Sequence, residues 1–226
     1  MSELKEGDRR ELRRYLGSPR PEDPMPPEIE RLMDRCFDRA QSAARPRSVV
    51  SVLLPLERRG EGLLAGPLRL EGRVIAAHLE HCTHAVLLGA TLGAPLDSLL
   101  RQTEVLDMAE AVVLDACANL LVEREADRAE EALRLRLKGQ GLYLTGRFSP
   151  GYGDFPLTVQ RELLRLLDGP GRIGLTVSSS FVMNPRKSIT AVLGAAEIPV
   201  TGRRAGCASC LMRDKCVYRK RGTTCE

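Results

Sequence analysis

One long segment constrains the fold of this chain more than any other. Residues 104–137 are rich in Ala, Leu, Glu and Arg and contain neither Gly nor Pro. Strong helix formers without a helix breaker predict one long helix, which Gly139 and Gly141 end. Of the 226 residues, 43% are hydrophobic and 28% are charged. This composition predicts a packed globular protein of one large or two small domains, and excludes collagen, a disordered chain and a coiled coil as the whole structure.

Strands and helices are mixed along the rest of the chain. Helical spacing of apolar residues predicts helices at 9–16, 28–42, 73–81, 95–102 and 158–168, and apolar runs predict strands at 48–56, 67–71, 85–93, 142–148, 173–183 and 188–195. The sequence NPRK between the last two runs predicts a hairpin. The order is not a strict alternation of strand and helix, so the α+β class fits better than a doubly wound parallel sheet.

Composition also limits the location and the partners of the chain. The sequence holds no run of about 18 uncharged apolar residues, so no transmembrane helix is predicted. Residues 1–16 show no apolar core of a secretory signal. Seven cysteines without a secretory signal favour a reducing compartment, so a cytoplasmic protein is expected. Trp is absent and Phe and Tyr number four each, which argues against nucleic-acid binding by stacking.

The basic charge is concentrated in a cysteine-bearing tail. Residues 203–226 carry seven basic and two acidic residues, a net charge of +5, whereas the preceding residues carry a net charge of −1. Four cysteines of this tail follow the spacing C-x2-C-x5-C-x8-C: Cys207, Cys210, Cys216 and Cys225. Such spacing is typical of a zinc site and also fits an iron–sulfur cluster, and the sequence leaves this choice open. A set of free thiols is the simpler alternative.

A row of histidines offers a second, weaker candidate for metal binding. His78 and His81 are spaced to share a helix face, and His84 follows with Cys82 beside the row. No carboxylate lies at a recognised metalloenzyme spacing from them, so a role at the surface or as a helix cap is expected instead.

The loop RFSPGYGDFP, residues 147–156, is the most unusual short segment. Its glycines would let a ligand approach the backbone closely. Arg147 could hold a carboxylate through two parallel hydrogen bonds, and Tyr152 offers a phenol and a ring face nearby. A tight structural turn with an exposed arginine is the alternative.

Three segments together carry a family resemblance. The sequence AVLLGATLG with the helix DMAEAVVLDACANLLVE, the segment RFSPGYGDFPLTVQRELLRLLD, and the segment SSSFVMNPRKSITAVLG resemble the activation domain of cobalamin-dependent methionine synthase, in particular its stand-alone form. The resemblance covers residues 45–195 and is most specific in the R-x-x-P-G-Y loop and in the S-F-x-M-x-P-R-K-S segment.

The resemblance implies a curved, mainly antiparallel sheet flanked by helices. It implies S-adenosylmethionine binding during the reductive methylation that rescues cob(II)alamin, with an electron from flavodoxin or a ferredoxin-type donor. By resemblance, Arg147 holds the carboxylate of S-adenosylmethionine, the backbone of Phe148 contacts the adenine, Gly151 belongs to the cofactor-binding loop, and Tyr152 lies as the catalytic residue between methyl donor and corrin. No residue is assigned to the amino group of S-adenosylmethionine.

Departures from the family define the expected role of the chain. The sequence has no cobalamin-binding D-x-H-x-x-G segment and no homocysteine or folate domain, so the chain is expected to reactivate a separate methionine synthase as an accessory component. Whether it is an enzyme alone is left open. Alternatives are a reactivator of another corrinoid methyltransferase and a non-catalytic, metal-stapled binding protein with a basic tail. The predicted organisation is an N-terminal helical segment with a Pro-rich connector (1–45), an activation-like domain (46–200) and the Cys-rich tail (201–226).

Overall fold

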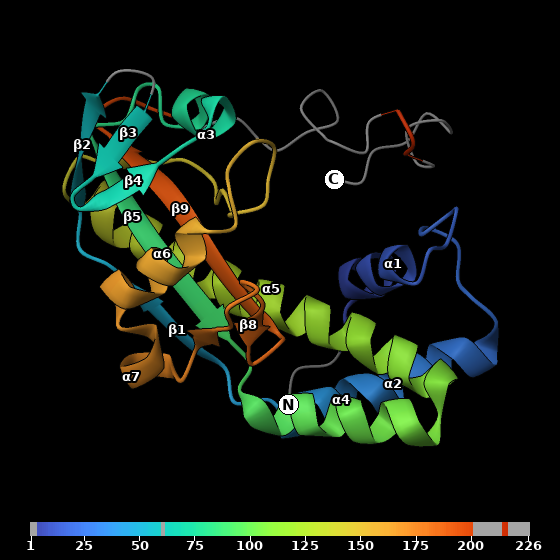
Figure 1. Ribbon diagram of the computed structural model, residues 1–226. Helices are drawn as coiled ribbons and strands as arrows, with labels where there is room; N and C mark the ends of the chain where they lie inside the picture. The colour runs from blue at the N-terminus through green and yellow to red at the C-terminus, as the bar shows by residue number, and fades with distance from the viewer. Residues whose placement is uncertain (1–3, 60–61, 201–213, 217–226) are drawn as a thin grey trace.

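A mainly antiparallel sheet with helices on both faces forms the centre of the molecule (Figure 1). The computed structural model describes residues 4–59, 62–200 and 214–216. The sheet has the strand order β4-β3-β2-β5-β9-β6. β1 pairs with the second half of β5, and β2 pairs with the start of β5. Its strands are β1 (Arg47–Val50), β2 (Leu54–Arg59), β3 (Gly62–Ala65), β4 (Leu68–Leu70), β5 (His84–Thr91), β6 (Tyr143–Leu144) and β9 (Ser188–Ala196). The predicted α+β class with an antiparallel sheet is confirmed.

Two buried strands hold the sheet together. β5 and β9 pair antiparallel over eight residues each, from His84 opposite Ala195 to Thr91 opposite Ser188. Alternate residues of β5 face opposite sides of the sheet, as the two-residue period of a strand requires. Val86 and Leu88 pack in a cluster with α5, whereas Leu87 packs in a cluster with α6. Both faces are therefore apolar, which is why these strands appear in the sequence as continuous apolar runs.

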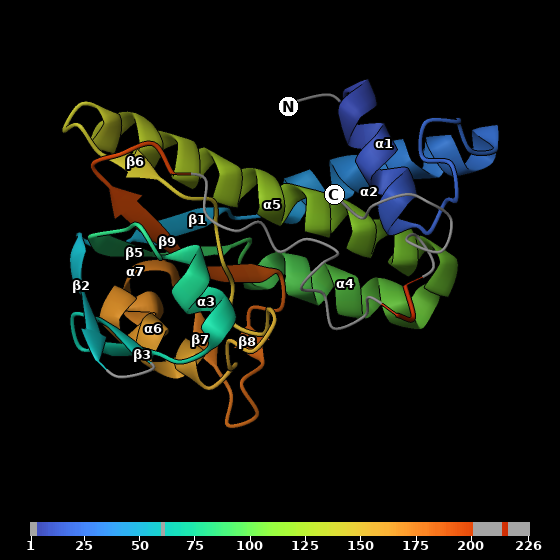
Figure 2. The same cartoon turned by 90° about the horizontal axis from the view of Figure 1, so that it is seen from above.

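The helix predicted at 104–137 is present but begins later. α5 (Met108–Lys138) runs across one face of the sheet, and α6 (Val159–Leu167) with α7 (Gly169–Ile173) covers the other (Figures 1 and 2). Asp107 separates α5 from α4 (Ala94–Leu106), because its side chain accepts a hydrogen bond of 3.0 Å from the Glu110 N–H and so caps α5. Residues 104–106 thus belong to α4.

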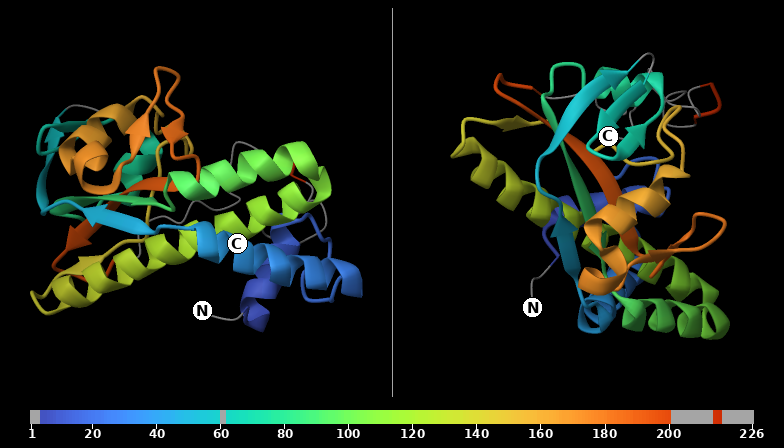
Figure 3. Two further views of the ribbon diagram at one scale, coloured as in Figure 1. Left: turned by 90° about the horizontal axis from the view of Figure 1, so that it is seen from below. Right: turned by 60° about the vertical axis from the view of Figure 1, so that its left-hand side comes forward.

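The N-terminal half of α5 extends beyond the sheet and carries a helical layer (Figures 2 and 3). α1 (Glu6–Tyr15), α2 (Pro27–Ala43) and α4 pack there around a core that includes Leu12, Met33 and Phe37. Cys36 and Cys117 lie in this core with no exposed surface. Their burial raises the pKa of both thiols, so they are poor nucleophiles.

The prediction of a hairpin between residues 173–183 and 188–195 is wrong. Residues Gly169–Ile173 form α7, and β7 (Thr176–Val177) pairs with β8 (Met183–Asn184) in a small separate sheet. β9 pairs instead with β5 and β6, which are distant in sequence. A strand that is apolar on both faces buries more surface in the centre of a sheet than in a hairpin with its sequence neighbour. Local turn signals in the sequence do not reveal this preference.

Two other predicted segments are shorter or divided. The run 48–56 forms β1 and β2, which pair with different parts of β5. The helix predicted at 73–81 is α3 (Arg73–His78). None of the described helices is long and apolar enough to span a bilayer.

Candidate functional site

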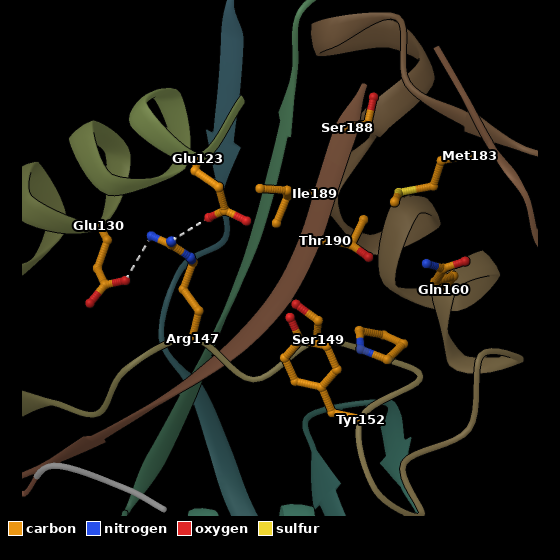
Figure 4. Close-up of a pocket in the computed structure, with 11 residues that line it drawn as sticks. Glu123, Glu130, Arg147, Ser149, Tyr152, Gln160, Met183, Ser188, Ile189 and Thr190 are labelled. Atoms are coloured by element: carbon orange, nitrogen blue, oxygen red, sulfur yellow. Dashed lines mark hydrogen bonds and ion pairs between the residues drawn. The ribbon is translucent and has the colours of Figure 1, made fainter. Parts of the chain in front are cut away.

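A cavity of about 550 Å³ lies at the outer edge of β9 (Figure 4). An isolated bridge joins Phe148 to Val192. In the described part of the chain, no strand pairs with the outer edge of β9 at residues 188–191. α5 borders the cavity on one face of the sheet and α6 on the other. The cavity is lined by Glu123, Glu130, Arg147, Ser149, Pro150, Tyr152, Gln160, Met183, Ser188, Ile189 and Thr190. Its volume is in the range of small-molecule sites.

Arg147 stands at the α5 end of the cavity among three carboxylates. Its guanidinium donates to Glu123 at 2.9 Å, to Asp127 at 2.8 Å and to Glu130 at 3.0 Å. Burial alone would lower the pKa of Arg147, but the hydrogen bond and charge of Asp127 and the charges of Glu130 and Glu123 raise it. Burial also raises the pKa of Glu123, which Arg147 only partly offsets. Arg134 also donates to Glu130 at 2.6 Å. The three carboxylates outnumber these two cations, so we call Arg147, Glu123, Asp127 and Glu130 the acidic end.

Sequence reasoning missed the three carboxylates of the acidic end. Glu123, Asp127 and Glu130 are spaced i, i+4 and i+7 on α5, which places them on one face of the helix. This acidic stripe was the available signal. In a helix rich in both charge signs it is easily taken for a solvated face, because only the tertiary structure brings Arg147 against it.

Phe148 is buried behind the cavity and supports the loop. Its side chain is 1% exposed and its ring lies 5.0 Å from that of His78 and 5.8 Å from that of Tyr152, centroid to centroid. Its N–H donates to Val192 O and its C=O accepts from Val192 N, each at 2.9 Å. The Phe148 N–H is therefore already used within the protein, and the predicted backbone contact with adenine stays a prediction.

Gly151 and Tyr152 form the turn at the mouth of the cavity. Gly151 has φ of +96°, and a Cβ there would lie 3.1 Å from Leu157, so this tight turn favours glycine. Tyr152 is 47% exposed and meets the Phe148 ring edge-on at 81°. One side of the phenol thus rests on the core while the other lines the cavity. Gly151 itself is not among the lining residues.

The histidine row is divided between the core and the surface. His78 is 3% exposed, and its Nε2 lies 3.0 Å from Thr145 Oγ1 and 3.1 Å from Gly146 O. The expected surface role is therefore wrong for His78, although the residue does lie in the last turn of α3. Its side chain anchors the segment leading to Arg147. His81 is exposed. Within residues 4–59, 62–200 and 214–216, no group of three or more His, Cys, Asp or Glu side chains could hold a metal.

Most of the predicted cysteine site lies outside the described residues. Cys207, Cys210 and Cys225 are not described, whereas Cys216 is a half-buried free thiol. The zinc or iron–sulfur site stays a prediction.

The α6 end of the cavity is neutral and differs from the acidic end. Gln160 is 4% exposed and Thr190 is 2% exposed. In the part of the chain that the structure describes, neither Gln160 Oε1 nor Thr190 Oγ1 has a hydrogen-bond partner. Met183 adds a thioether, and Figure 4 places all three on the side of β9 away from Arg147. We call this group the neutral end.

Comparisons with known proteins agree with the fold. No family model matches the chain, and no curated protein matches it. A crystal structure of the MetH reactivation domain bound to AdoHcy superimposes on 98% of this chain and 85% of its own, with a TM-score of 0.62 and 18% sequence identity. At this identity the likeness shows the fold. The chain thus has an α+β fold with a cavity at the edge of its sheet, and this fold is that of the MetH reactivation domain.

Proposed function

We propose that the chain binds S-adenosylmethionine in the cavity at the β9 edge. The observation that carries the proposal is the acidic end, where one arginine is surrounded by three carboxylates. The amino-acid group of S-adenosylmethionine is a zwitterion. Its carboxylate fits Arg147, and its ammonium fits Glu123 or Glu130, which fills the assignment that the sequence left empty. Because the two charges enter together, no side chain of the cluster is left without a counter-charge.

Charge and size support the same ligand. S-adenosylmethionine carries a net positive charge from its sulfonium, and the acidic end stays net negative when Arg134 beside Glu130 is counted with it. Tyr152 gives the mouth of the cavity an aromatic face, which favours a cation. The rest of the cavity is neutral and long enough to extend across β9 to α6 (Figure 4).

The proposed role is reductive methylation of a cobalamin on a separate methionine synthase. When both are bound, S-adenosylmethionine supplies a methyl group and the reduced cobalt accepts it. This chain holds the methyl donor through Arg147 and presents it beside Tyr152, which is exposed enough to meet a partner protein. An electron donor of the flavodoxin or ferredoxin type completes the system. Another corrinoid methyltransferase as partner would use the same site.

The test compares ligand binding with recovery of the cobalamin. S-adenosylmethionine should raise the melting temperature of the wild type in a concentration-dependent way. Arg147→Lys keeps the charge but loses the two-pronged geometry, so it should stay folded and bind at least about tenfold more weakly. Arg165→Lys on the exposed face of α6 is the matched control. Absence of any thermal shift in the wild type would refute S-adenosylmethionine binding.

A second assay tests the role itself. Methylcobalamin should re-form on an oxidised methionine synthase only when this protein, S-adenosylmethionine and a reductant are present together. If the protein binds the ligand but no corrinoid protein is methylated, the binding proposal stands and the reactivation proposal fails.

A further inference from the structure

We propose that the free edge of β1 is a docking site for an extended, acidic segment of a partner protein, which adds to the sheet as a further strand. The inference goes beyond the proposed function and concerns the side of the sheet opposite the cavity. Residues 88–91 of β5 pair with β1 on one side and with residues 188–191 of β9 on the other, and the cavity lies beyond β9. A partner on β1 would therefore leave the cavity open.

The first argument is the direction of the β1 backbone groups. In an antiparallel pair, successive residues turn their N–H and C=O groups alternately toward the partner strand and away from it. The Ser51 N–H donates to Leu87 O at 2.9 Å, so the odd-numbered residues of β1 face β5, whereas Ser48 and Val50 turn these groups outward. In the described part of the chain, no strand pairs with this outer side of β1. Such a row of unpaired backbone groups is a template for a further strand.

The second argument is the space beside this edge. A groove of about 350 Å³ lies between β1 and α5, and Figure 3 shows the two elements side by side at the margin of the sheet. Its α5 wall consists largely of small residues, Ala129 and Ala132, with Leu133 buried at the base. Alanine side chains leave room for the side chains of an added strand. This face of α5 is not the one that carries the acidic end, so the two surfaces are separate.

The third argument is charge, which selects the occupant. Arg128 and Arg136 line the groove and Arg47 lies at the start of β1, and all three are exposed. Arg128 pairs with Glu125 at 2.7 Å, but among the described residues neither Arg47 nor Arg136 has a carboxylate partner. These two arginines give the groove a net positive charge, which attracts an acidic segment.

The same charges disfavour two other occupants. Two copies of the chain that joined edge to edge would bring Arg47 and Arg136 of one copy toward those of the other, and like charges at an interface are unfavourable. Residues 203–226 of the chain itself carry a net charge of +5 and would also meet like charge. An acidic strand from another protein fits the edge, the groove and the charges together.

The experiment uses the full chain and two synthetic peptides. One peptide alternates valine with glutamate over about nine residues, and the other carries lysine in place of each glutamate. In calorimetric titration at low salt, the glutamate peptide should bind at least about tenfold more tightly. Arg47→Glu combined with Arg136→Glu should abolish or reverse this preference. Arg31→Glu combined with Arg101→Glu changes the net charge equally at exposed positions outside the groove and should retain it.

Backbone hydrogen exchange tests the strand addition itself. The glutamate peptide should slow the exchange of the Ser48 and Val50 amides, which face outward. Val50→Pro removes one outward N–H without removing a bond to β5, so it should weaken the peptide several-fold. Should Val50→Pro fail to fold, the glutamate peptide methylated at alternate backbone nitrogens tests the same bonds and should bind as weakly.

Three results would overturn the proposal. They are equal binding of the two peptides by the wild type, binding without protection of the Ser48 and Val50 amides, and a dimer in sedimentation whose Ser48 and Val50 amides are already protected. In the last case the edge would belong to a second copy. The cavity takes no part in these measurements, so a failure of S-adenosylmethionine binding would leave their outcome unchanged.

Discussion

The two ends of the cavity differ in how their polar groups are paired. At the acidic end, Arg147 and the carboxylates of α5 pair with one another. At the neutral end, Gln160 and Thr190 each keep a buried polar atom without a partner among the described residues. The acidic end therefore contributes to the fold and would exchange partners when a ligand binds. The neutral end contributes nothing to stability through these atoms and would gain partners only from a ligand.

The largest expected effect comes from removing the cation of the acidic end. Arg147→Met leaves Glu123 and Asp127 without their cation, whereas Glu130 keeps Arg134, whose guanidinium lies 2.6 Å from its carboxylate. Because the Arg147 side chain is only 17% exposed while Asp127 is well solvated, the free energy of unfolding should fall by about 2 kcal/mol. Urea denaturation measures it.

Two further variants check the cause of this loss. Adding Asp127→Asn to Arg147→Met removes one repelling charge and should restore part of the stability. If it restores none, repulsion among the carboxylates is not the cause. Arg165→Met breaks an exposed pair with Glu162 and should have no measurable effect.

The next effect is the pH dependence of S-adenosylmethionine binding. Burial raises the pKa of Glu123 in the free protein, and a bound ammonium would lower it again. Affinity should therefore be highest above the raised pKa and should fall about tenfold as the pH decreases through it. Calorimetry as a function of pH measures this. Glu123→Gln should remove most of the dependence, and a wild-type profile identical to that of Glu123→Gln would contradict the role of this carboxylate.

The smallest effect, and the only stabilising one, is expected at the neutral end. Thr190→Val removes a buried hydroxyl that has no partner and keeps the side-chain shape. The free energy of unfolding without ligand should stay the same or rise by up to about 1 kcal/mol. Thr145→Val is the contrasting variant, because the Thr145 hydroxyl contacts His78, Gly146 and Gly194 and its loss should destabilise the protein by about 1–2 kcal/mol. A clear destabilisation by Thr190→Val would show that the hydroxyl has a partner after all.

The sequence predicted those parts that depend on local chemistry. Residues without Gly or Pro form α5, and the loop with Arg147 and Tyr152 reaches the cavity because its glycines and prolines fix a turn. The pairing of β9 and the composition of the neutral end could not be predicted. Gln160 looks like an ordinary polar residue at the start of an amphipathic helix, and Thr190 like one polar residue in an apolar strand. Only long-range packing buries both at one place.

The bridge between Phe148 and Val192 also sets a length. It fixes the loop that carries Arg147 at one point of β9, and Thr190 lies two residues from Val192 along that strand, about 7 Å away. Since β9 is paired with β5 along almost its entire length, this spacing cannot stretch. The strand therefore fixes the minimum length of any molecule that contacts Arg147 and Thr190 at the same time.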